Sequence, residues 1–386
     1  MSLKIESAFP GGNVFIEDIN GFEVLLTRDM RNTAGDWFYW CFKAIFDKEG
    51  LYRFTFTQPD SCSSCGPAVS YDDGLTWEWL SLDCVSGQHN VFTYRFDPSG
   101  KPEVIFCVGM QYLPRHLEKF LQRHAGNPCL TQSVLTRSRK NRSVPLLHIE
   151  DTSCTGTIKR IYFSSRHHCC VMMATYALEG ILETALGEDE TGKLFRQHYV
   201  IDSVPFADMD GVVDGDQGKN RRPHDQNRDY GNAPIYPEVR AIQELLQQAP
   251  LFFALDLHCP WLHGTANNET IYFPGPEEEY YAKEMEKFSR ILERRSPEEA
   301  PHFTANNIPF GTQWNTRSNY STGSGLNCSG WIRKVCQPHF AQAMEIPYAK
   351  AGEKVLNPTS VRAFGRAIAQ SILEYDRVIS SGNALH

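Results

Sequence analysis

Two patterns of apolar residues divide the chain. Up to about residue 100, short aromatic and β-branched runs alternate with turn residues, which is typical of an all-β sandwich. The strands predicted there are 21–26, 37–42, 52–56 and 92–96. Beyond about residue 100, apolar runs alternate with segments in which apolar residues recur at helical spacing. This pattern predicts a mixed, largely parallel sheet with helices on both faces. The sequence therefore predicts a small β-sandwich domain over residues 1–103 and an α/β domain over residues 104–386.

Composition narrows the class of protein. The 386 residues carry a formal net charge of -8, and a surface for nucleic acid would need clustered Lys and Arg. The first residues lack the apolar core of a secretory signal, and no apolar run is long enough to span a membrane. Twelve cysteines in such a chain are expected to be free thiols. We therefore expect a cytoplasmic protein that binds neither nucleic acid nor a membrane.

Candidate chemistry begins at residues 164–180, where a β-branched and aromatic run ends in His167-His168 and is followed by helical spacing from Met172. Open α/β sheets bind ligands at the carboxyl ends of their strands. A pair of histidines at a strand end is by itself more often structural than functional. The neighbouring thiols of Cys169 and Cys170 lie too close to His168 in the chain to bind one metal ion together with it.

Three further segments place polar side chains after apolar runs. Residues 251–258 form an apolar run that ends in Asp256-Leu257-His258, and side chains two positions apart on a strand share a face. The short run at 343–348 contains Glu345. The segment 225–230, which precedes both in the chain, contains Asn227-Arg228, and an arginine with an amide can bind a carboxylate. Each segment alone has a common structural explanation, and their joint occurrence is less easily explained in that way.

In this order the four segments resemble the zinc metallocarboxypeptidases of the carboxypeptidase A clan, and the preceding β-sandwich resembles the cytosolic carboxypeptidases. The family pattern is His-x-x-Glu, followed eight residues later by Glu-Gly. Counting back from Glu179-Gly180 makes His168 the first metal ligand and places Val171 where the family has its glutamate. The resemblance implies that His168 and His258 hold one zinc ion.

The resemblance also implies the remaining roles. Glu345 would be the general base and acid, Asn227 and Arg228 would bind the terminal carboxylate, and Tyr320 would close over the substrate. Of the basic residues Lys219, Arg221 and Arg222, we expect Arg221 to stabilise the developing oxyanion.

The expected function is zinc-dependent hydrolysis of a C-terminal peptide or related amide bond, in a peptide or protein C-terminus or in a small amide. Val171 cannot coordinate a metal, whereas a catalytic zinc normally has three protein ligands. The alternative is therefore a catalytically inactive relative that binds carboxylate-terminated peptides. The presence of His168, His258, Glu345 and Arg228 favours the enzyme, and Val171 favours the binding module.

Overall fold

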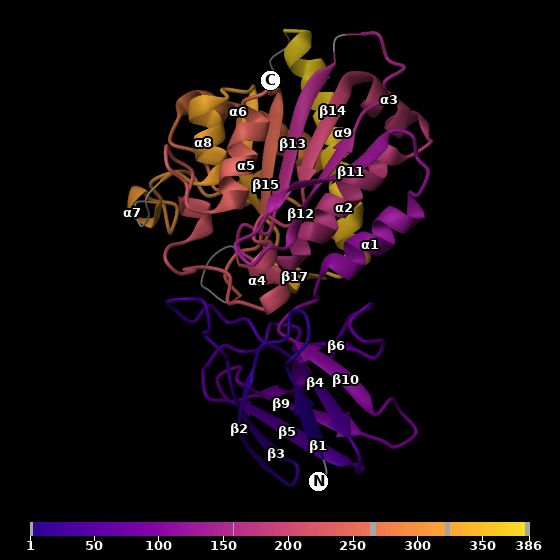
Figure 1. The fold of residues 1–386 in the computed structure, drawn as a ribbon, viewed down its shortest axis with the longest axis vertical. Coiled ribbons are helices and arrows are strands. Elements are labelled where there is room, and N and C mark those ends of the chain that lie inside the picture. Colours follow the sequence, from indigo (N-terminus) through magenta and orange to yellow (C-terminus); the bar gives the residue numbers. More distant parts are fainter. Residues whose placement is uncertain (1–2, 157, 263–267, 321–324, 383–386) are drawn as a thin grey trace.

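A computed structural model of the chain describes residues 3–156, 158–262, 268–320 and 325–382 (Figure 1). The chain forms two lobes stacked along the long axis, an N-terminal lobe of strands and a larger lobe of strands and helices (Figure 1).

The N-terminal lobe contains two five-stranded sheets. Aromatic rings fill the space between them: the centroids of Phe54 and Phe92 lie 4.8 Å apart, and those of Phe42 and Phe106 lie 5.6 Å apart. The predicted β-sandwich is confirmed. One sheet has the order β1 (Leu3–Glu6), β4 (Cys41–Phe46), β10 (Glu103–Cys107), β6 (Ala68–Ser70), β7 (Glu78–Trp79), and the other the order β2 (Phe15–Asn20), β3 (Glu23–Thr27), β5 (Gly50–Phe56), β9 (Val91–Phe96), β8 (Val85–Ser86).

Two details of this lobe differ from the sequence-based expectation. The strand β10 pairs with β4 and β6, so the N-terminal lobe extends past the predicted boundary at residue 103 to include Cys107. The strand predicted at 37–42 begins only at Cys41. The amides of residues 37–39 donate instead to the side chain of Gln217 in the larger lobe, which keeps this segment out of the sheet.

The larger lobe is built on a six-stranded sheet of mixed direction. Its four consecutive strands β14, β13, β15 and β16 are parallel, and β12 and β11 continue the sheet in antiparallel pairing. The predicted fold class is therefore confirmed. The order across the sheet is β11 (Leu130–Arg137), β12 (Ser143–Ile149), β14 (Tyr199–Val204), β13 (Lys159–Ser165), β15 (Phe253–His258), β16 (Phe340–Glu345).

Helices cover both faces of this sheet (Figure 1). In β13, Ile161 and Phe163 belong to the core formed with α2, α6 and α9, whereas Tyr162 between them belongs to the core formed with α5 and α8, as the period of a strand requires. The helices of the first face are α1 (Pro114–Arg123), α2 (Met172–Leu186), α3 (Glu190–His198), α6 (Glu279–Arg295) and α9 (Pro358–Ser380), and those of the second are α5 (Pro237–Leu246) and α8 (Cys328–Val335). Shorter elements are η1 (Leu82–Cys84), α4 (Met209–Asp214), η2 (Gln226–Arg228), η3 (Thr304–Asn306), α7 (Arg317–Tyr320) and the hairpin β17 (Lys350–Ala351) with β18 (Lys354–Val355).

The contact between α2 and α9 depends on glycine. A Cβ atom at Gly180 would lie 2.1 Å from the carbonyl oxygen of Arg362, and one at Gly365 would lie 2.0 Å from that of Ala177. Helix backbones can approach this closely only where side chains are absent. The Glu-Gly pair of the sequence motif thus has a packing role: Glu179 is buried and pairs with Arg123 and Arg362, and Gly180 admits α9.

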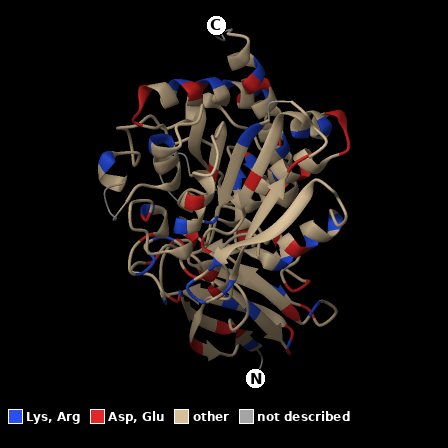
Figure 2. Cartoon of the chain, turned by 45° about the horizontal axis from the view of Figure 1, so that its top comes forward, with Lys and Arg blue, Asp and Glu red and all other residues tan. Residues whose placement is uncertain are grey.

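Charged residues of both signs are interspersed over the two lobes (Figure 2). Among the described helices, none combines the length and the apolar character needed to cross a membrane.

Candidate active site

The predicted site residues gather at the carboxyl ends of β13, β15 and β16. A cavity of about 530 Å³ opens there, and its lining includes six of them: His168, Asn227, Arg228, His258, Tyr320 and Glu345. Strand register explains part of this arrangement, because β15 and β16 are parallel neighbours and His258 is paired with Glu345 at their ends. The cavity occupies the position at which open α/β sheets bind ligands.

A left-handed residue directs the two histidines apart. Arg166, which follows β13, has φ 64°, a conformation that residues other than glycine rarely adopt. Its buried guanidinium donates to the carbonyl oxygens of Cys169 and Tyr112 at 2.6 and 2.7 Å, which holds the turn. As a result His167 is fully buried, whereas His168 lies at the cavity.

Each cavity histidine has a carboxylate behind it. Nε2 of His168 lies 3.1 Å from Oδ1 of Asp225, and Nε2 of His258 lies 2.7 Å from Oδ2 of Asp256. Within the described residues, Nδ1 of neither ring has a hydrogen-bond partner, and the ring centroids are 5.3 Å apart. Metal-binding histidines are commonly oriented by a carboxylate on the other ring nitrogen. These two residues therefore fit a metal ion bound through Nδ1.

Burial and neighbouring charges shift the pKa values of the two rings in opposite directions. Burial lowers the pKa of His168 to about 4, so its ring is neutral at neutral pH, as a ligand must be. Burial would also lower the pKa of His258, but the adjacent Asp256 outweighs it and raises that pKa. Burial would raise the pKa of Asp225, yet His168 and Arg228 outweigh it and keep the pKa low. Both supporting carboxylates are thus poised to remain ionised.

A second group of possible ligand atoms lies deeper. Those of His167, Asp256 and His258 are all within 4.8 Å of one another. However, Asp256 also accepts hydrogen bonds from Nδ1 of His167 and the hydroxyl of Ser164, both at 2.8 Å, and the Tyr230 hydroxyl lies 2.6 Å from Nε2 of His167. His167 is therefore occupied on both ring nitrogens and acts as a buried support of Asp256, a role that the sequence did not reveal.

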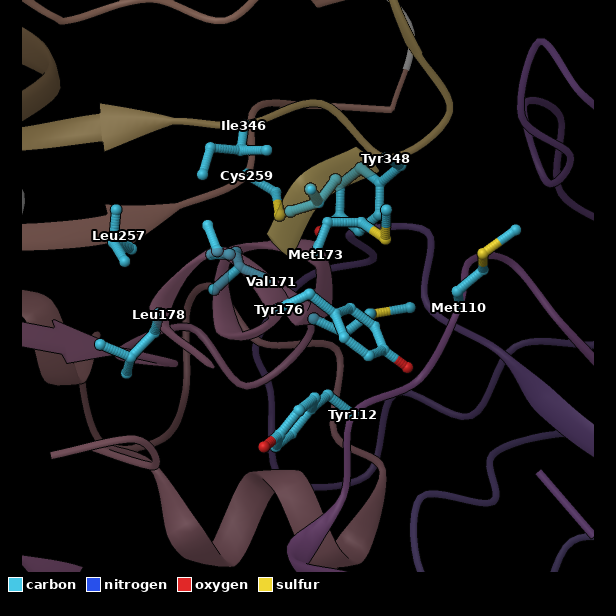
Figure 3. Packing of buried hydrophobic residues seen from close by; sticks show 14 of the residues in the cluster. Met110, Tyr112, Val171, Met173, Tyr176, Leu178, Leu257, Cys259, Ile346 and Tyr348 are labelled. Atoms are coloured by element: carbon cyan, nitrogen blue, oxygen red, sulfur yellow. The ribbon is translucent and has the colours of Figure 1, made fainter. Parts of the chain in front are cut away.

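Val171 contributes nothing to the cavity. It is the residue before α2, is 1% exposed, and lies among buried side chains that include Leu178, Cys259 and Ile346 (Figure 3). The two thiols beside it do not replace a carboxylate. Cys169 Sγ lies 3.2 Å from the carbonyl oxygen of Asp216, and burial raises the pKa of Cys170 to about 12, so neither is placed as a thiolate ligand at the cavity.

Glu345 offers an unpaired carboxylate oxygen. Its Oε2 is buried and, among the described residues, has no hydrogen-bond partner. Burial raises the pKa of the carboxyl, and the nearby His258 and Lys219 only partly offset this. Unpaired buried polar atoms are rare in folded proteins and often mark functional sites. A carboxylate with a raised pKa is suited to transfer protons.

The same cavity has a basic lining residue, Arg228. Arg228 lies over the Tyr320 ring at 5.2 Å, and its buried Nε has no partner in the described part of the chain. Asn227 accepts a hydrogen bond from the Cys328 amide through Oδ1 at 2.9 Å, and its amide nitrogen lies 3.4 Å from Nε2 of His258. The Tyr320 hydroxyl donates to Oδ1 of Asn315. Residues 321–324, which follow Tyr320, lie outside the described residues.

Arg221 lies elsewhere. Its guanidinium is held between Asp208 and Asp216 at 2.9 and 2.7 Å, and it is not among the residues that line the cavity. Lys219, two positions earlier, does line the cavity, and burial and the charge of Arg228 lower its pKa. The sequence contained three candidate cations in one short run. Only the path of the backbone decides which of them reaches the cavity.

Comparisons with known proteins agree with this fold. No protein-family model matches the chain. A putative carboxypeptidase from Burkholderia mallei superimposes with a TM-score of 0.79, 17% identity and coverage of 98% of each chain. A metallo-carboxypeptidase from Pseudomonas aeruginosa, in complex with (2-guanidinoethylmercapto)succinic acid, gives a TM-score of 0.77 at 16% identity and covers 98% of this chain and 100% of that one. Both lobes therefore have the arrangement seen in metallocarboxypeptidase structures.

Sequence relatives point to the same class. Cytosolic carboxypeptidase 6 of Caenorhabditis elegans is 22% identical over 70% of this chain and 66% of its own length. Cytosolic carboxypeptidase 2 of Macaca fascicularis is 24% identical over 77% of this chain but 39% of its own length, so the chain spans only part of such relatives. The chain therefore has the fold of the metallocarboxypeptidases, and its sequence is similar to the cytosolic carboxypeptidases.

Proposed function

We propose that the protein is a zinc-dependent carboxypeptidase that removes a C-terminal residue, or cleaves a related amide bond, in the cytoplasm. The observation that carries the proposal is the pair of cavity histidines, each with a carboxylate at Nε2, in a cavity that a buried arginine also lines. His168 and His258 would hold the metal. When bound, zinc supplies Lewis acidity and lowers the pKa of water.

The chain's own residues would bind the substrate and move the proton. The guanidinium of Arg228 and the amide of Asn227 would hold the terminal carboxylate, since both present donors at the same wall. Tyr320 would pack over the bound residue. Glu345 would accept a proton on its unpaired oxygen and pass it to the leaving amine. Lys219, rather than Arg221, would stabilise negative charge on the scissile carbonyl, because Lys219 lines the cavity.

An adjoining cavity suggests where the released residue binds. It measures about 810 Å³ and shares Pro274, Tyr320, Asn327 and Ala343 with the first cavity. Its wall includes Arg333 and Lys334. Because Tyr320 lies at the junction, a side chain next to the bound carboxylate would enter this second cavity.

The second candidate is a binding module without catalysis, and Val171 is the observation that favours it. Two imidazole ligands hold zinc more weakly than two imidazoles together with a carboxylate ligand. Such a module would still bind carboxylate-terminated peptides through Asn227 and Arg228.

Zinc content of the purified protein, compared with that of Val171→Glu, separates the candidates. About one zinc per chain in the unmodified protein, with cleavage of peptides that have a free but not an amidated C-terminus, supports the enzyme. Zinc bound only by Val171→Glu, with peptide binding but no cleavage by the unmodified chain, supports the module. Since Val171 is buried, the variant's carboxylate must reach the cavity to act, and Val171→Gln controls for the loss of packing.

A further inference from the structure

One wall of the cavity includes a residue from the N-terminal lobe. Trp37, from the N-terminal lobe, lines it together with Trp261 and Lys219. The two indole rings meet edge to face at 4.1 Å, and Lys219 Nζ lies 4.9 Å above the Trp37 ring. Trp261 remains 38% exposed, although it is a large aromatic residue. The pair thus forms an aromatic surface that is open to the cavity.

This wall is held firmly in place. Oε1 of Gln217, which is fully buried, accepts hydrogen bonds from the amides of Trp37, Phe38 and Tyr39 at 3.2, 3.0 and 2.9 Å. Phe38 has φ 138°, a strained value for a residue other than glycine. Its ring packs against Trp261 and Tyr348 at 5.2 and 5.3 Å, which stabilises that conformation. Strained backbone that the surroundings hold in place is often found at functional sites.

The contacts made by the ring of Trp37 do not include the residues that would bind the carboxylate. The contacts of Arg228 are with Asn227, Asn319 and Tyr320. Those of Trp37 are with Phe38, Trp261 and Lys219. Arg228 and Trp37 share none of these contact residues. All of the residues except Phe38 nevertheless line the same cavity. Because Arg228, the two cavity histidines and Trp37 line one cavity, a peptide held at its carboxylate by Arg228 would reach Trp37 within that cavity.

Resting on the proposed function, we infer that Trp37 and Trp261 form the subsite for the residue that precedes the scissile bond, and that this subsite selects an aromatic side chain. Edge-to-face and offset-stacked contacts between aromatic rings add to the free energy gained by burying them. The N-terminal lobe would thereby determine part of the substrate specificity of the larger lobe.

The test compares acetyl-Phe-Glu with acetyl-Ala-Glu, by kcat/KM for release of glutamate and by calorimetric Kd. The unmodified protein is expected to prefer the Phe peptide roughly tenfold, and Trp37→Ala to reduce the preference to about twofold or less. Trp37→Phe should retain most of the preference for the Phe peptide. This variant keeps the test decisive if Trp37→Ala does not fold. The matched control is Trp79→Ala: Trp79 joins the lobes through a hydrogen bond to the Leu356 carbonyl oxygen and does not line the cavity.

The two proposals fail in different ways. Cleavage of both peptides at equal rates, or a preference that survives in Trp37→Ala, overturns the aromatic subsite and leaves the proposed enzyme standing. A preference in Kd that depends on Trp37, without any cleavage, supports the subsite and overturns the enzyme.

Discussion

At the scale of single residues, the cavity histidines and the buried one beside them should respond differently to the same substitution. His168→Gln and His258→Gln each remove an Nδ1 that has no other partner in the described structure. Zinc affinity should therefore fall at least tenfold, because a loss of about tenfold is already common when a group that only orients a metal ligand is removed. His167→Gln should retain most of the zinc, because both ring nitrogens of His167 bond to protein groups. Calorimetric zinc titration measures the three affinities.

Thermal unfolding of the metal-free variants serves as the control for folding. If zinc binding survives in His168→Gln and disappears in His167→Gln, the ion is held by the deeper group of His167, Asp256 and His258.

The basic run at 219–222 allows a comparison of neighbouring cations. Lys219→Met removes the cation that lines the cavity. Loss of one group that stabilises an oxyanion typically costs about 10²- to 10³-fold in kcat, so we expect a fall in kcat with little change in KM. Steady-state kinetics on a cleaved peptide measures the effect. Arg222→Met is the matched control, since Arg222 is exposed and outside the cavity lining; an equal loss in both variants would refute a specific role of Lys219.

At the scale of secondary-structure elements, a buried histidine makes one junction sensitive to acid. His302 is fully buried, and its ring lies 2.7 Å from the Ser289 hydroxyl of α6 and 3.1 Å from the Ile271 carbonyl oxygen. Burial lowers its pKa to about 4, from 6.5. Between these values the unfolded chain binds a proton that the folded chain does not, so the free energy of unfolding should fall as the pH falls, by at most about 1.4 kcal/mol per pH unit.

His302→Gln can keep hydrogen bonds at this junction and cannot titrate. Urea unfolding from pH 7.5 to 4 should therefore show a shallower decline in the variant below pH 6.5 and parallel curves above it. Parallel curves over the whole range would contradict the assignment.

Elements with strong periodicity were predicted closely. The helix expected at 172–186 is α2, Met172–Leu186, and the apolar run at 251–258 contains β15, Phe253–His258. Elements whose structure depends on residues far away in the sequence were predicted less well. The run at 105–108 has the composition of any strand, and only its pairing with β4 assigns it to the N-terminal lobe. Residues 37–40 have strong β propensity, but Gln217 binds the amides of residues 37–39 and keeps them out of the sheet.

At the scale of the whole molecule, Gln217 should be a main determinant of how firmly the lobes are joined. Its side chain makes five hydrogen bonds to the N-terminal lobe, three by acceptance from residues 37–39 and two by donation to the carbonyl oxygens of Asp29 and Tyr39. Gln217→Ala leaves buried amides without an acceptor, which should lower the free energy of unfolding by roughly 2–4 kcal/mol. Urea unfolding measures the loss.

Gln248→Ala is the control for this comparison, because Gln248 is exposed and should change stability by less than about 0.5 kcal/mol. A loss in Gln217→Ala no greater than in the control would mean that other contacts between the lobes, such as the hydrogen bond from Trp79 to the Leu356 carbonyl oxygen, suffice to join them.

The sequence alone predicts the β-sandwich, the mixed sheet and the resemblance to the metallocarboxypeptidases, because hydrophobic periodicity and four ordered motifs are properties of local segments. It also named six of the residues that line the cavity, since the ends of parallel strands meet at one edge of a sheet. Only the tertiary structure decided that Lys219 and not Arg221 faces the cavity, that His167 supports Asp256, and that Trp37 joins the site from the other lobe. These outcomes depend on backbone turns and on hydrogen bonds between residues far apart in the chain, which no local pattern specifies.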